Sequence, residues 1–219
     1  IFQTWHSKLL PPLMCANVLN IQKNNPGFKY FLFDDHDCRE FIKKHFQKNV
    51  LFAYDRLIPG AYKADLWRYC ILYKIGGIYL DISYGPIRGF KLFRLTKKEH
   101  WVLDADGNYV YNALMVCKAG NPLLLQAIDK ICENVKHRHY GGDYLMPTGP
   151  GLLSTFFSSD EKNKFDMKHV VRGGKDSDRV IQFMNQDALS CYSGYFAERA
   201  RTSKTKHYST LWNERRVFL

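Results

Sequence analysis

The sequence has no apolar run that approaches the roughly 18 residues needed for a membrane-spanning helix. It also has no proline- or serine-rich linker, no internal repeat and no low-complexity tract. Its first residues, IFQTW, lack the basic region and apolar stretch of a secretory signal. We therefore expect a globular chain without a transmembrane segment. Its 219 residues favour one domain with one sizeable core, and a content of 46% hydrophobic residues agrees with that class.

The six cysteines never occur at the C-x-x-C spacing of zinc and redox sites. Cys70 and Cys132 fall on the apolar faces of predicted helices, and Cys117 falls in a strand-like run. Such positions are typical of free buried thiols. Free thiols in turn predict a reducing compartment such as the cytoplasm, because disulfides persist mainly in oxidising ones.

Acidic residues are few, 21 against 32 lysines and arginines, which gives a net charge of +11. Nucleic acid, an anionic membrane surface and a diphosphate would all suit such a charge, and so would a plain solvated surface. Aromatic and basic residues do not interleave as they do in single-strand or RNA-binding modules, so nucleic acid is the least favoured partner. The basic residues are densest near the end of the chain, at Arg199, Arg201, Lys204, Lys206, Arg215 and Arg216.

The most informative stretch is AYKADLWRYCILYKIGGIYLDISY, residues 61–84. Apolar residues at helical spacing predict a helix that ends at Ile75. Gly76 and Gly77 follow, and glycine accepts the left-handed conformation of a helix C-cap without steric cost. The alternating residues beyond them predict a strand that ends near Asp81.

Three charged residues of this stretch are candidates for a site. Asp65 and Arg68 are three residues apart, so they share one face of the predicted helix. Asp81 follows the strand, and ligands of open α/β sheets collect at the carboxyl ends of strands. The alternatives are an intrahelical ion pair for Asp65 and Arg68, and a turn-capping role for Asp81.

The string A-x-x-A-D-L-W-R-Y-x-I-L-Y-x-x-G-G-I-Y-L-D-I resembles the sugar-nucleotide-binding core of glycosyltransferase family 32. The segments IFQTWHS and GGIYLDI are most similar to those of glycosyltransferases of large algal viruses. This similarity would place the protein in the host cytoplasm. The resemblance implies an α/β fold of the GT-A type, which is a Rossmann-like sandwich with a mixed, mostly parallel sheet. It also implies a nucleotide-binding half, residues 1–84, and a sugar and acceptor half, residues 85–219.

The implied activity is transfer of a hexose or deoxyhexose from a UDP- or GDP-sugar to a hydroxyl of a glycan or glycoprotein, with retained anomeric configuration. The family closes the strand with D-x-D and uses its carboxylates for Mn²⁺ or Mg²⁺. This chain has Asp81-Ile82-Ser83, and serine is a weaker ligand for a hard cation than a carboxylate. A catalytically inactive sugar-nucleotide-binding relative is therefore one alternative, and a basic nucleic-acid-binding protein is the other.

The resemblance also implies a set of site residues. Asp81, Asp65 and Arg68 would form the catalytic centre, with Asp65 and Arg68 on the donor sugar and ribose. Trp5 would stack on the base, and His207 would contact the diphosphate. The remaining substrate-binding residues would be Tyr79, Asn112, Thr148 and Trp212, and the metal ligands would be Asp81, Ser83 and His207.

Two other acidic clusters have simpler interpretations. Asp104-Ala105-Asp106 precedes Gly107 and is typical of a hairpin turn, although it could replace the missing carboxylate of the strand. In the loop 34–37, we expect Asp35 or Asp37 to cap the helix that follows, because a helix amino end favours negative charge.

Overall fold

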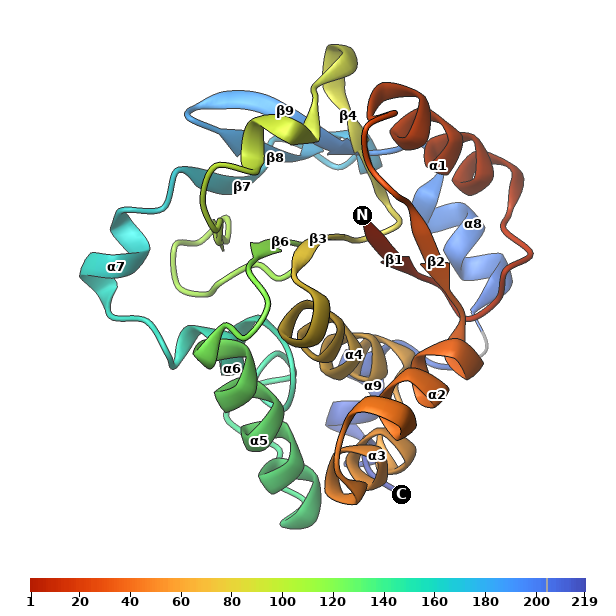
Figure 1. Ribbon diagram of the computed structural model, residues 1–219. Helices are drawn as coiled ribbons and strands as arrows, with labels where there is room; N and C mark the ends of the chain where they lie inside the picture. Colours follow the sequence, from red (N-terminus) through yellow and green to blue (C-terminus); the bar gives the residue numbers. More distant parts are fainter. Residues whose placement is uncertain (204) are drawn as a thin grey trace.

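The computed structural model describes residues 1–203 and 205–219, so Lys204 of the basic tail lies outside the described residues. Its strands form two sheets (Figure 1). The first has the order β2-β1-β3-β6, made of Phe31–Phe33, Phe2–Thr4, Gly77–Leu80 and Leu114–Cys117. The second has the order β4-β9-β8-β7-β5, made of Tyr84–Pro86, Gln186–Cys191, Arg179–Phe183, Met167–Val171 and Val102–Leu103.

Helices lie around these sheets, and most of them gather on one side of the first sheet (Figure 1). The α-helices are α1 Pro12–Asn24, α2 Asp35–His45, α3 Lys48–Arg56, α4 Gly60–Ile75, α5 Pro122–Lys136, α6 Pro150–Ser154, α7 Ser159–Asn163, α8 Tyr195–Thr202 and α9 Tyr208–Asn213. The short 3₁₀ helices are η1 Ile87–Gly89, η2 Leu92–Leu95 and η3 Asp176–Asp178.

The first sheet is buried on both faces. One face packs on α2 to α5 through a large core cluster that contains Trp67 of α4 and Tyr79 of β3. The other face packs on the second sheet, where Leu80 of β3 meets Ile181 and Leu189. Strand β3 is covered on both sides, and its carboxyl end leads to the half-buried Asp81.

The α/β fold class is confirmed, and the first sheet is mixed and mostly parallel as expected. β1 runs parallel to β2 and β3, and β6 closes the sheet in the antiparallel direction. The antiparallel tendency after Gly89 produces a separate second sheet, in which only the pairing of β5 with β7 is parallel. The sequence did not predict that this second sheet would cover the first.

The predicted helix-glycine-strand unit is present. Helix α4 ends at Ile75, and Gly76 follows at φ 71°. A Cβ atom at this position would lie 2.6 Å from the backbone nitrogen of Ala119, so the close approach of two chains also requires glycine. Gly77, at φ 109°, then begins β3.

The two additional acidic clusters both make turns or caps. Asp34 caps α2: its Oδ1 accepts the N–H of Asp37 at 2.9 Å, and the Asp37 carboxylate accepts the N–H of Asp34 in return. The expectation that Asp35 or Asp37 is the cap residue is therefore wrong by one position. Asp104 accepts the N–H groups of Asn108 and Tyr109, which closes the predicted hairpin.

All six cysteines are free thiols, as predicted. Within the described part of the chain, no helix is both long enough and apolar enough to cross a bilayer.

A buried glutamate of helix α8, near the C-terminus, caps helix α1, near the N-terminus. Helix α1 begins at Pro11 and Pro12, which provide no side-chain cap for its free N–H groups. Glu198 of α8 takes that place, because its carboxylate accepts the N–H of Leu13 at 2.8 Å and that of Met14 at 3.0 Å. Tyr192 donates a third hydrogen bond to the same carboxylate.

Replacing Glu198 by alanine should lower the free energy of unfolding by about 2–3 kcal/mol, because two helix N–H groups lose a charged acceptor in a buried place. Urea denaturation would measure the change. Glu161→Ala, which removes a cap from the exposed helix α7, should cost clearly less. Equal losses in the two variants would contradict the role assigned to Glu198.

Candidate functional site

The charged residues singled out in the sequence form one connected network at the end of β3. The Arg68 guanidinium lies 3.4 Å from Oδ1 of Asp65 and 3.2 Å from Oδ1 of Asp81. It also donates a hydrogen bond of 2.7 Å to the carbonyl of Asn112 and lies 4.3 Å from the centre of the Tyr79 ring. One buried cation thus joins a helix carboxylate to a strand-end carboxylate.

Asp65 is buried and has a partner on each oxygen. Asn112 donates from Nδ2 to Oδ1 at 2.9 Å, and Thr148 donates from its hydroxyl to Oδ2 at 2.8 Å. Burial raises the pKa of Asp65, although Arg68 and these hydrogen bonds act in the opposite direction. The donors of Asn112 and Thr148 are therefore used within the protein. Both side chains thus hold Asp65 in place in this structure, and their expected contact with substrate stays a prediction.

Tyr79 has a similar role toward Asp81. Its ring is 1% exposed, and its hydroxyl donates to Oδ1 of Asp81 at 2.7 Å. Tyr79 thus holds Asp81 in place, and its expected contact with substrate stays a prediction. The side chain of Asp81 is 33% exposed, against 10% for Asp65 and 6% for Arg68. Asp81 is therefore the most exposed member of the network.

The expected metal ligands do not fit a metal held by the protein alone. Ser83 is buried, and its hydroxyl bonds to the thiol of Cys191 inside the core. This corrects its assignment as a ligand. His207 uses Nδ1 to cap α9, where it accepts the N–H of Ser209. Across residues 1–203 and 205–219, no group of three His, Cys, Asp or Glu side chains could hold an ion. Asp81 is the carboxylate that the end of β3 offers.

The aromatic residues from the two ends of the chain differ in their surroundings. Trp5 is half-buried against Met14 and Val18, and its indole N–H is buried without an acceptor among the described residues. Trp212 packs on the main core and donates its indole N–H to the carbonyl of Tyr140. The structure thus gives Trp212 a packing role, which replaces its expected role in substrate binding.

The C-terminal helix α9 lies near the charged network of Asp65, Arg68 and Asp81. Tyr208, which begins α9, packs its ring on those of Tyr62 and Tyr144. Burial and the charge of Asp65 raise the pKa of Tyr208 to about 12. His207 lies beside it, and desolvation together with the charge of Arg199 lowers the pKa of His207.

Polar side chains of the second sheet and of the segment before β6 lie together, and the sequence did not predict this group. Tyr84 and Tyr111 share a hydrogen bond of 3.0 Å between their hydroxyls. The Tyr111 ring stacks on His169 with centroids 4.1 Å apart. Nε2 of His169 is buried without a partner among the described residues, and burial lowers the pKa of this imidazole to about 4. No local pattern distinguishes His169 from an ordinary strand residue, so only the fold identifies it.

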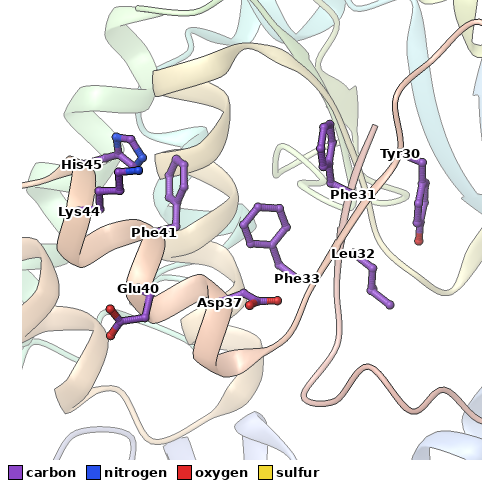
Figure 2. Close-up of a pocket in the computed structure, with 9 residues that line it drawn as sticks. All are labelled: Tyr30, Phe31, Leu32, Phe33, Asp37, Glu40, Phe41, Lys44 and His45. Carbon is purple, nitrogen blue, oxygen red and sulfur yellow. The ribbon is translucent and has the colours of Figure 1, made fainter.

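An open groove lies elsewhere, along the free edge of the first sheet (Figure 2). Its walls come from β2 and α2, and Phe33 and Phe41 point toward one another across it. It contains none of the predicted site residues. We therefore place the candidate site at the end of β3, where the charged network lies, and treat this groove as a surface feature.

Comparison with known proteins identifies relatives of this chain. Residues 13–112 match the family described as glycosyltransferase sugar-binding region containing DXD motif. The chain is 32% identical over 163 residues to inositol phosphoceramide mannosyltransferase 3 of Schizosaccharomyces pombe, covering 74% of this chain and 45% of that protein. It is 26% identical over 223 residues to the initiation-specific alpha-1,6-mannosyltransferase of Candida albicans, covering 84% and 58%. The chain thus spans about half the length of these curated relatives.

A viral relative and a solved structure add to these matches. The uncharacterized glycosyltransferase L373 of Acanthamoeba polyphaga mimivirus is 44% identical over 64 residues, which cover 29% of this chain and 26% of that protein. The PaToxG glycosyltransferase has a TM-score of 0.57 at 17% identity and matches 70% of this chain and 65% of its own. The predicted glycosyltransferase fold, of the GT-A type, is confirmed by this likeness, and a large-virus glycosyltransferase is among the relatives as expected.

The buried imidazole of His169 should make stability depend on pH. Between about pH 6.5 and 4 the unfolded chain binds a proton that the folded imidazole does not, so stability falls as the pH falls through this range. The contribution of this residue is at most about 1.4 kcal/mol per pH unit.

His169→Phe, which keeps the ring stacking, should remove this contribution from the pH dependence of the unfolding free energy measured in urea. His36→Gln changes an exposed histidine and should leave the wild-type slope. Identical slopes for His169→Phe and wild type would show that His169 is protonated as readily in the folded protein as in the unfolded one.

Proposed function

Residues 13–112 belong to the glycosyltransferase family whose sugar-binding region contains a DXD motif, and from this premise we propose that the chain transfers a sugar from a nucleotide diphosphate to an acceptor hydroxyl. The observation that carries the proposal is the convergence of Asp65, Arg68 and Asp81. They come from two ends of one motif and meet where β3 opens toward solvent.

In this proposal the transferred group is a hexose or deoxyhexose, and the donor is a UDP- or GDP-sugar. Mannose is the first sugar to test, because two of the relatives are named mannosyltransferases. The acceptor is a hydroxyl of a glycan or glycoprotein, and transfer retains the anomeric configuration. The main catalytic demand is then to stabilise the charge that develops on the leaving diphosphate.

Each residue of the network has a place in this proposal. Asp81 is the exposed carboxylate and would face the ribose or a metal ion. Asp65 and Arg68 would hold the donor sugar and ribose from below, with Asn112, Thr148 and Tyr79 fixing their positions. Trp5 would lie against the base, and His207 would donate a hydrogen bond to the diphosphate.

We also propose that Mn²⁺ or Mg²⁺ binds only together with the nucleotide. Asp81 offers one carboxylate, whereas a hard cation requires about six oxygen ligands. The phosphates would have to supply several of them. An inactive relative that binds the donor without transferring the sugar is the second candidate, and the inward-facing Ser83 is the observation that favours it.

Asp65→Asn should weaken donor binding and turnover by about tenfold or more, because a charged hydrogen bond is worth about 1.5–3 kcal/mol. Wild type and variant would be titrated with GDP-mannose, GDP-fucose, UDP-glucose and UDP-galactose, and sugar release would be followed. Asp129→Asn, on the exposed face of α5, is the matched control and should behave as wild type.

The outcomes separate the candidates. If none of the donors binds to wild type, the proposed function is wrong. Binding without release or transfer of the sugar would support the inactive relative. Unchanged binding and turnover in Asp65→Asn would remove Asp65 from the site.

Mn²⁺ should bind weakly to the protein alone and about tenfold more tightly when UDP or GDP is present, because the phosphate oxygens complete its ligand shell. Calorimetric titrations of Mn²⁺ into the protein, into the nucleotide and into their mixture would measure this difference. Asp81→Asn should abolish the gain that the protein adds. Tight Mn²⁺ binding by wild type without nucleotide would contradict the proposal.

A further inference from the structure

Arg179 lies at the end of the second sheet that is nearest to the candidate site. The register pairs Tyr84 with Cys191 and Val180 with Ser190 in neighbouring antiparallel strands. Arg179, one residue before Val180, therefore stands opposite Cys191 on the face that Cys191 and Tyr84 share. That face is the one that packs on the first sheet. In Figure 1 the strands concerned, β4, β9 and β8, lie side by side above β3.

This end of the second sheet is joined to Asp81 by the turn that follows β3. The carbonyl of Asp81 accepts the N–H of Tyr84 at 3.0 Å, and the carbonyl of Ser83 accepts that of Tyr192 at 2.9 Å. The Ser83 hydroxyl bonds to the Cys191 thiol from the same turn. The end of β8 that carries Arg179 therefore lies on the same side of the second sheet as the turn that follows Asp81.

Arg179 has no salt bridge among the described residues, although the carboxylate of Asp176 lies nearby, where it accepts the N–H of Phe196. The Arg179 guanidinium lies 5.0 Å from the centre of the Phe196 ring. Arg179 is exposed to solvent, whereas Arg68 is buried between two carboxylates. Besides burial, which raises the pKa values of Tyr84, Tyr111 and Cys191 most, Asp81 raises and Arg179 lowers these pKa values, in agreement with this register.

A second arginine has the same character. Arg199 of α8 hydrogen-bonds to Tyr195 and also forms no ion pair within residues 1–203 and 205–219. Tyr195 and Tyr208 feel the charges of both Arg199 and Asp81. Strand β8 and helix α8 come together here: Arg179 of β8 lies over the ring of Phe196, and Arg199 follows Phe196 one helical turn later. Tyr195, beside Phe196, packs against the cluster that contains Ile82, the residue after Asp81.

We propose that Arg179 and Arg199 form the anion site that binds the diphosphate of the donor beside Asp81. This inference rests on the proposed function, and it names the residues that would meet the charge of the leaving group. A planar guanidinium can donate two parallel hydrogen bonds to a phosphate, and two arginines would match the two phosphate groups. Their charge would supplement whatever a single carboxylate can recruit as a metal ion.

The test compares a nucleoside diphosphate with its nucleoside. UDP against uridine, and GDP against guanosine, would be titrated calorimetrically into wild type, R179Q and R199Q, once with Mn²⁺ and once with EDTA. Each variant should bind the diphosphate about tenfold more weakly, since a charged hydrogen bond is worth about 1.5–3 kcal/mol. The nucleoside should bind within about twofold of wild type, because it makes no phosphate contact.

Two further variants control for charge and folding. Lys168→Gln removes one positive charge from the outer face of the same sheet and should leave both affinities unchanged. R179K keeps the charge and should recover part of the lost affinity. Circular dichroism and the thermal midpoint would establish that each variant folds.

Different results overturn different claims. If wild type binds UDP or GDP and R179Q binds it equally well, the anion site is wrong while the proposed function stands. Equal losses for the diphosphate and the nucleoside in R179Q would also overturn it, because Arg179 would then act on the base or on folding. If wild type binds neither nucleotide, both the proposed function and the anion site fail.

Discussion

The site depends on one buried cation. Arg68 is removed from water together with Asp65, and the desolvation of such charges costs several kcal/mol unless each finds partners. The partners are Asp65, Asp81, the carbonyl of Asn112 and the face of Tyr79. These charges keep the pKa of Arg68 above its ordinary value, although burial acts against it. Helix α4, strand β3 and the segment before β6 must therefore meet at one point.

This requirement explains why so many polar residues around the site face inward. Asn112 and Thr148 give their donors to Asp65, and Tyr79 gives its donor to Asp81. A carboxylate left with a free buried oxygen would cost more than these side chains could gain from transient contact with a ligand. The network is thus prepared before any donor arrives. Asp81, at its outer end, is the member left to face solvent.

Sequence predicted the parts of this arrangement that depend on neighbouring residues. The helix, the glycine pair and the strand of residues 61–84 follow from spacing and from the conformational freedom of Gly76, and they bring Asp65 and Asp81 together. The inward turn of Ser83 could not be predicted, because its partner Cys191 lies more than a hundred residues later along the chain. Pairings of this kind depend on strand register across sheets, which no local pattern encodes. For the same reason, the sequence did not identify Arg179 as a candidate site residue.

Two neighbouring residues of helix α8, Glu198 and Arg199, have different roles in the C-terminal region. Glu198 turns inward and caps α1, which follows the Trp5 segment at the end of β1. Arg199 is next along the helix, so anchoring Glu198 also fixes the direction in which Arg199 leaves it. The basic tail is therefore not a uniformly solvated surface. Arg199 is one of the residues of the proposed anion site, and the buried Glu198 beside it fixes the helix that carries it. The position of a positive charge at the site thus depends on a helix cap at the opposite end of the chain.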